Sequence, residues 1–499
     1  MTDPQISRQT SILSLVKNSL TISAAFVLLR FLLTPIRIRV LTELLEPGDY
    51  GMVTLLTMSA HGMALIVSLG GFEYWLRRLP AASMEIRLNS LWQVFRISSL
   101  LGFFLCLGIA AGWGPSAWYG DGKVQLTGAV VACLFALVLH VQQRLYYLLG
   151  TQSHLRARVT QLLWSDLWYL FLLPFGAGMI WSAESVLWIW CAWMLALSLI
   201  TWAWVPLGKA FRNRSACPTE QRWVRQSLPI LPILLSEWIF RLSGQYVILA
   251  EIDAHTMALY ALALNLSLVG YAAGVPLIDV CITTFNARFR EEMHAEIPSE
   301  MAIILSRALR LVMVICLPVA LALIFLSDAL LGLLASSAFA GAAAYLPLAA
   351  PVPFLMLMAL LFGRIAMSFD KTPVACVAGL AGGLLTLMLS ILWVNPWGVN
   401  GVFFAVHAGL LLCNLILFFL LKLYRWFRLA SLGPGSLLFG TVILGLLFAG
   451  IHSLNFPALI LLALAGLASL AVIWVCRWIV PADMQLLGAE PSRSEISLE

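Results

Sequence analysis

The sequence predicts an all-α integral membrane protein of about fourteen transmembrane helices: two pseudo-symmetric six-helix bundles and two C-terminal helices. The first observation is composition, because 61% of the 499 residues are hydrophobic and only 11% are charged, whereas soluble domains are about 25% charged. The second is a series of apolar runs of about 20 residues, each long enough to cross a bilayer. Continuous runs favour helices over barrel strands, which alternate apolar and polar residues.

The predicted spans follow one another along the chain with mostly short connections. Their approximate limits are 16–41, 50–72, 89–112, 124–149, 159–181, 185–208, 226–250, 257–281, 303–327, 344–367, 374–394, 397–421, 432–452 and 457–479.

The positions of the 30 Lys and Arg residues test this count. With the N-terminus in the cytoplasm, nearly all of them fall at cytoplasmic ends and loops. Only Arg37, Arg39 and Lys123 fall outside, and Arg30 and Arg241 lie within spans. The positive-inside rule therefore predicts that both termini are cytoplasmic. The net charge of +6 is explained by this topology, and we expect no nucleic-acid partner.

The chain begins without the pattern of a cleaved signal peptide, so the first span is expected to be retained. Its nine cysteines are scattered, mostly in apolar segments, and include no CxxC pair. Packing residues are the expected role for them, and no metal site is predicted.

An internal repeat is the basis for the predicted bundles. Arg30 precedes Tyr50 by nearly the same interval as Arg241 precedes Tyr260. Six spans per copy give both copies the same orientation, which is one of the transporter patterns. The predicted division is an N-terminal bundle 1–208, a cytoplasmic linker 209–225, a C-terminal bundle 226–421, two appended helices 432–479 and a cytoplasmic tail 480–499.

Polar side chains recur at helical spacing within several spans. In the seventh span Glu237, Arg241 and Gln245 are four residues apart and share one face. Ionisable residues inside a membrane must face protein or a water-filled cavity, so these stripes predict a cavity with cationic walls between the bundles. The predicted substrate-binding residues are Arg30, Arg241 and Arg37. The candidates for lining the cavity or for coupling are Asp166, Glu237, Gln245, His61, Asn265 and Asp279.

Each candidate has an alternative role. Glu237 and Arg241 can neutralise one another as an i,i+4 ion pair. Asp166 can be a counter-ion for Arg30 or a proton carrier, and His61 can be a hydrogen-bonded packing residue. Arg37 can extend its charged end to the outer surface of the membrane that the chain spans.

Two prolines, Pro229 and Pro232, lie near the inner end of the seventh span. They are compatible with a helix that changes shape as a gate or with a static bend.

Two stretches near the N-terminus, PIRIRVLTELLEPGDYGMVTLL and SLGGFEYWLRR, resemble the start of the polysaccharide transport family. This family, whose best-known members are Wzx-type flippases, is part of the multidrug/oligosaccharidyl-lipid/polysaccharide (MOP) exporter superfamily. The most specific part is an R-x-L pattern at Arg39 followed by the turn Gly48-Asp49-Tyr50-Gly51. The later segment LLGLLASSAFAGAAAYLPLAAP also fits the pattern of the family.

The resemblance implies a flippase of the bacterial inner membrane. Such proteins move undecaprenyl-diphosphate-linked oligosaccharides to the periplasmic leaflet by alternating access, for O-antigen, capsule or exopolysaccharide assembly. In related flippases the last two helices hold the lipid tail, which here corresponds to 432–479. The bilayer, the lipid-linked glycan and possible polymerase or co-polymerase proteins are the implied partners. The resemblance does not fix the binding residues, but a diphosphate in a low-dielectric cavity needs a cation, and arginine offers a bidentate fork.

Two other function classes compete with this one. An ion-coupled exporter of small molecules or drugs would favour acidic and aromatic cavity walls, which Asp166 and Glu237 leave open. An enzyme is disfavoured because no outer loop is long enough to carry a catalytic cluster. The sequence has no G-x-x-x-x-G-K-[ST] loop, so ATP-driven transport by this chain and a bound cofactor are not expected.

Overall fold

The computed structural model describes most of the predicted membrane region. The described residues are 29, 33–72, 75, 84–109, 128–151, 153–165, 167–172, 181–205, 227–289, 299–369, 371–425, 433–454 and 456–476. Two predicted site residues, Arg30 and Asp166, lie outside them, as does the side chain of Asp279. Within this part the regular secondary structure is helical, apart from one isolated bridge between Leu45 and Trp181.

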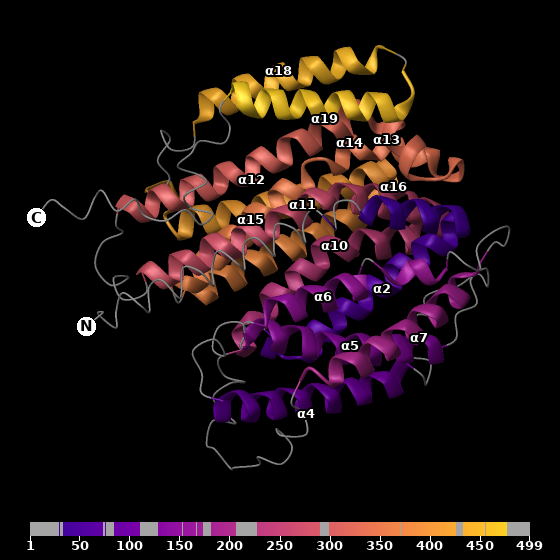
Figure 1. The fold of residues 1–499 in the computed structure, drawn as a ribbon, viewed down its shortest axis with the longest axis vertical. Helices are drawn as coiled ribbons and strands as arrows, with labels where there is room; N and C mark the ends of the chain where they lie inside the picture. Colours follow the sequence, from indigo (N-terminus) through magenta and orange to yellow (C-terminus); the bar gives the residue numbers. More distant parts are fainter. Residues whose placement is uncertain are drawn as a thin grey trace, which may run out of the picture.

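The first half of the chain forms one group of helices around α5. Its members are the helical segment 33–44, α2 (Pro47–Val67), α4 (Met84–Gly108), α5 (Gly128–Gly150), α6 (His154–Ser165), η4 (Trp168–Phe171) and α7 (Ala183–Trp202). Helix α5 packs against α2, α4, α6 and α7. Helix α2 also packs against α10 and α11 of the second half, so it joins the two groups (Figure 1).

The second half forms another group. Its members are η6 (Leu228–Ile230), α10 (Leu231–Glu251), α11 (Ala254–Phe289), α12 (Ser299–Phe325), α13 (Ser327–Leu334), η7 (Ser337–Tyr345), α14 (Leu346–Ala349), α15 (Val352–Ser368), α16 (Thr372–Leu420) and η8 (Leu423–Arg425). The last helices, α18 (Pro434–His452) and α19 (Ala458–Val475), pack on α12 and α13. In Figure 1 they lie at the opposite end of the molecule from α4.

Helix α16 contains two spans. Its 49 residues break at Gly398, where φ is 57° and ψ is −141°, a backbone conformation that glycine adopts without strain. The two parts fold back on each other, since a Cβ on Gly382 would lie 2.5 Å from the carbonyl oxygen of Gly409. The break falls at the start of the predicted span 397–421, four residues after the end of the predicted span 374–394.

The described part contains 10 helices long and apolar enough to cross a membrane, or 11 if the bent pair 337–349 and 352–368 counts as one span. Helix α16 is counted once among them although it holds two spans. Large apolar side chains on α4, α18 and α19, including Phe104, Leu438 and Trp474, are exposed on the outside of the molecule, where lipid would cover them. The predicted fold class is confirmed.

The two prolines of the seventh span lie at its N-terminal end. Pro229 lies in the 3₁₀ turn η6, and Pro232 lies in the first turn of α10. Proline suits the first turn of a helix because its missing N–H has no partner to lose there. The structure therefore places no proline bend inside α10 itself.

Helices α2 and α10 meet at Gly62, where a Cβ would overlap the indole ring of Trp238. We expect Gly62→Ala to destabilise this packing by about 1–3 kcal/mol, the usual cost of overpacking a tight contact. Thermal unfolding of the purified protein measures the effect. The matched control is Gly363→Ala in α15, where a Cβ meets nothing within 4 Å. An equal loss of stability in both variants would contradict the assignment.

Candidate functional site

Helix α10 is held in place by small residues on one face. A Cβ on Gly379 of α16 would lie 2.5 Å from the hydroxyl oxygen of Ser236, so only glycine permits this approach. Ser236 is buried in the contact. Successive helix positions are about 100° apart, so Glu237 and Arg241 lie on a neighbouring face of α10. The glycine contact therefore directs the charged stripe away from α16.

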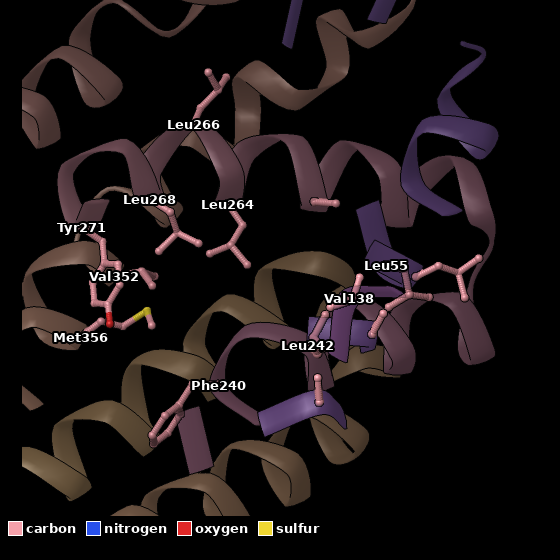
Figure 2. Packing of buried hydrophobic residues seen from close by; sticks show 14 of the residues in the cluster. Leu55, Val138, Phe240, Leu242, Leu264, Leu266, Leu268, Tyr271, Val352 and Met356 are labelled. Carbon is pink, nitrogen blue, oxygen red and sulfur yellow. The ribbon is translucent and has the colours of Figure 1, made fainter. Parts of the chain in front are cut away.

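Three side chains on this neighbouring face form what we call the ion-pair cluster: Glu237, Arg241 and Tyr271. The Arg241 Nη2 atom donates to Glu237 Oε1 at 2.7 Å. The Tyr271 hydroxyl of α11 donates to the same oxygen at 3.2 Å. The Arg241 Cζ atom lies 4.7 Å from the centre of the Tyr271 ring, a cation–π contact. Figure 2 shows Tyr271 beside Val352 and Met356 of α15.

Both charged side chains are partly exposed although they lie near the middle of a span. The exposed fraction is 38% for Glu237 and 27% for Arg241, and the candidate span runs from Leu228 to Glu251. Ionisable groups at such a depth mark a substrate or ion path by default. The partly exposed ion pair is therefore the best candidate for a functional site in the described part of the chain.

Gln245 continues the stripe but has a different environment. Its side chain is fully buried, and its Nε2 atom donates to the Arg241 carbonyl at 3.4 Å and to Met58 Sδ at 3.8 Å. One position further on, the Tyr246 hydroxyl is 2.6 Å from Ser59 Oγ. Gln245 and Tyr246 therefore link α10 to α2, and Gln245 is closed off from solvent.

His61 lies on α2 beside Gly62, the residue at which α2 meets Trp238 of α10. The charges of Arg241 and Glu237 are near enough to influence its ring electrostatically. Its Nδ1 atom is hydrogen-bonded to Gln142 Nε2, and its ring stacks on Trp164 with centroids 5.0 Å apart. The packing role that the sequence left open is therefore present.

Asn265 and Arg37 belong to a second group around Tyr50. Asn265 and Thr54 lie within hydrogen-bonding reach of the Tyr50 hydroxyl, on which the Arg37 charge also acts. Arg37 Nη1 donates to the Ser165 carbonyl at 2.5 Å. Because Ser165 ends α6, this contact satisfies a carbonyl at the negative end of a helix. Arg37 therefore has a clear structural role, and its predicted role in substrate binding stays a prediction.

The two halves are joined, at the helix ends that the predicted topology places outside, by contacts that we call the outer clasp. Its members are Arg39, Thr42, Tyr50 and Gly51 of the first half, and Ala258, Ala335, Ser336 and Phe339 of the second. The Ser336 hydroxyl donates to the Thr42 carbonyl at 2.7 Å, and the Ser336 N–H donates to Thr42 Oγ1 at 3.2 Å. Arg39 Nη1 donates to the Ala335 carbonyl at 2.5 Å and also pairs with Glu43.

The predicted turn Gly48-Asp49-Tyr50-Gly51 is wrong as a connection between spans: these residues form the first helical turn of α2, and they are part of this clasp. The Tyr50 ring packs edge-on against Phe339, with centroids 5.2 Å apart. A Cβ on Gly51 would lie 2.9 Å from Ala258 Cβ, so the glycine lets α2 approach α11. The motif therefore closes the outer contact between the two halves.

The structure brings together four predicted residues, namely Glu237, Arg241, Gln245 and His61. It adds Tyr271, Gln142 and Trp164, which the sequence reading missed. The polar pair Gln142-Gln143 inside an apolar span was an available signal, whereas Tyr271 and Trp164 are ordinary residues for a span. No group of three or more His, Cys, Asp or Glu residues in the described part could hold a metal ion.

No protein-family model matches the chain, and neither does any curated protein. Solved structures do match. The lipid II flippase MurJ in an inward closed conformation aligns with a TM-score of 0.65 at 14% identity, over 91% of this chain and 98% of that one. An inward-facing multidrug resistance MATE family transporter of the MOP superfamily aligns with a TM-score of 0.61 at 13% identity, over 82% and 95%.

The chain has the fold of these transporters. A third MOP superfamily transporter, from Pyrococcus furiosus, aligns with a TM-score of 0.54 at 14% identity, over 83% of this chain and 96% of that one. Its description reports a binding pocket of reversed polarity and suggests a different function. The MOP fold is thus found with pockets of different charge, so the substrate of this chain must be argued from its own residues.

Proposed function

We propose that this chain is a flippase that moves undecaprenyl-diphosphate-linked oligosaccharide repeat units across the bacterial inner membrane by alternating access, for surface polysaccharide assembly. The observation that carries the proposal is the partly exposed Arg241 side chain halfway along α10, paired with Glu237. A diphosphate that crosses a low-dielectric region needs such a cation, and arginine offers it two donors at once.

The extent of the structural match supports a lipid substrate. The lipid II flippase aligns over 91% of the chain, whereas the MATE transporter aligns over 82%. The difference is comparable to the share of the chain in α18 and α19. These helices are almost free of charge and pack on α12 and α13 at one end of the molecule (Figure 1). We propose that they accompany the lipid tail while the head group passes between the halves.

An ion-coupled exporter of small molecules is the second candidate. Glu237 is more exposed than Arg241, and an accessible carboxylate beside Tyr271 suits a cationic, aromatic compound. The MATE likeness is compatible with this function. The two candidates differ in which member of the ion pair contacts the substrate.

The leaflet distribution of undecaprenyl-linked glycan tests the flippase proposal. We expect cells lacking this protein to accumulate completed repeat units on the cytoplasmic face and to lose surface polymer. Restoration by the wild-type gene is the control. An unchanged leaflet distribution of the glycan, in a strain without a redundant flippase, would contradict the proposal and favour small-molecule export. Tags at each end, labelled in intact cells, test the proposed cytoplasmic termini.

A further inference from the structure

Arg241, the proposed binding residue for the diphosphate, already has an anionic partner in the ion-pair cluster, namely Glu237. The Glu237 carboxylate holds Arg241 through one donor, Nη2. A guanidinium has five N–H donors, and the Arg241 Nε atom is buried without a hydrogen-bond partner in the described part of the chain. The Glu237 carboxylate therefore uses only part of the hydrogen-bonding capacity of the Arg241 guanidinium.

This contact has the character of an exchangeable one. Both side chains are partly exposed, and exposed i,i+4 ion pairs are weak. A diphosphate offers two or more oxygens and more negative charge, so it can engage the guanidinium in bidentate fashion. Exchange of one anion for the other at Arg241 is thus favourable.

Tyr271 provides a second hydrogen bond that can hold the carboxylate after it leaves Arg241. Its hydroxyl donates to Glu237 Oε1, and its ring is buried against α15 (Figure 2). Glu237 can therefore leave Arg241 without losing its other hydrogen bond. A carboxylate that leaves reversibly can also return and help to expel the diphosphate.

We propose that Glu237 is a built-in competitor for Arg241, which lowers the affinity of the site for a diphosphate head group and so permits its release. The inference rests on the proposed function, because it assumes that Arg241 receives the diphosphate. It assigns Glu237 to affinity control rather than to simple neutralisation of charge. A transporter must bind its substrate weakly enough to release it, and a competing anion on the same helix achieves this without a new conformation.

Binding of inorganic pyrophosphate to the full-length protein in lipid nanodiscs tests the proposal. We expect Glu237→Gln to bind pyrophosphate about tenfold more tightly than wild type, because a nearby negative charge is removed at a partly exposed position. Arg241→Gln should lose binding. The matched control is Glu43→Gln, which breaks a second i,i+4 pair, with Arg39 in the outer clasp, and should leave affinity unchanged.

Several results would overturn the proposal. They are unchanged or weaker binding by Glu237→Gln, an effect of equal size in Glu43→Gln, unaltered binding by Arg241→Gln, or no binding by wild type and Glu237→Gln alike. If Glu237→Gln does not fold, Glu237→Ala is measured with the same expectation, after thermal unfolding shows that it is intact. Because this assay measures binding and the leaflet assay measures flipping, either can fail without the other.

Discussion

Replacement of Arg241 by alanine is expected to reduce transport by about 10- to 100-fold at matched protein levels. A hydrogen bond to a charged group contributes about 1.5–3 kcal/mol, and each 1.4 kcal/mol is a factor of ten in affinity. Arg241 lies within a span and contacts a partly exposed acid, Glu237. The leaflet distribution of lipid-linked glycan, with surface polymer as a second readout, measures the loss.

One further variant separates substrate binding by Arg241 from neutralisation of the Glu237 charge. Arg241→Ala leaves the Glu237 carboxylate with only its Tyr271 hydrogen bond in the described part, and this could itself disturb the helix. In the double variant Glu237→Gln/Arg241→Ala no charge is left unpaired. If Arg241 binds substrate, the double variant stays inactive. Recovery of transport would show that Arg241 serves only to neutralise Glu237.

The chemistry of the cation is tested by Arg241→Lys. Lysine keeps the charge but loses the planar fork, so we expect partial transport if charge dominates and poor transport if bidentate contact dominates. Lys371→Ala, an exposed cation between α15 and α16, is the control and should transport normally. This control excludes a general effect of removing positive charge.

The sequence could predict which residues share a face of one helix, but not which helices face one another. The spacing of Glu237 and Arg241 is local, and their ion pair is present. Gln245 obeys the same spacing yet is buried against Met58. The cause is the packing of α2 on α10, which depends on the distant glycine Gly62. No pattern within the seventh span contains that information.

The residues that complete the site come from three other helices. Tyr271, Gln142 and Trp164 lie on α11, α5 and α6, and their meeting depends on how deeply each helix is set relative to its neighbours. That register is set by side-chain interlocking over the whole core, to which both halves contribute. Figure 2 shows this mixture, with Leu55 of α2, Val138 of α5 and Leu242 of α10 in the same cluster. The roles of Arg30, Asp166 and Asp279 stay predictions.

Locking the outer clasp is expected to abolish transport almost completely. Alternating access requires the outer ends of the two halves to separate, and Thr42 and Ser336 join them through two hydrogen bonds, Ser336 Oγ to the Thr42 carbonyl at 2.7 Å and Ser336 N–H to Thr42 Oγ1 at 3.2 Å. A disulfide between Thr42→Cys and Ser336→Cys would replace two weak bonds by a covalent one. We expect oxidation to stop export in the double variant and a reductant to restore it. The leaflet assay in spheroplasts measures both states.

The single variants Thr42→Cys and Ser336→Cys are the controls, because each loses one clasp contact without gaining a cross-link. They should transport with little loss, since Arg39 with Ala335 and Tyr50 with Phe339 still hold the halves together. Full transport by a double variant shown to be cross-linked would mean that the outer ends need not part. The G-D-Y-G turn would then serve stability alone, and the route of the head group would have to avoid the contact between 33–51 and 335–339.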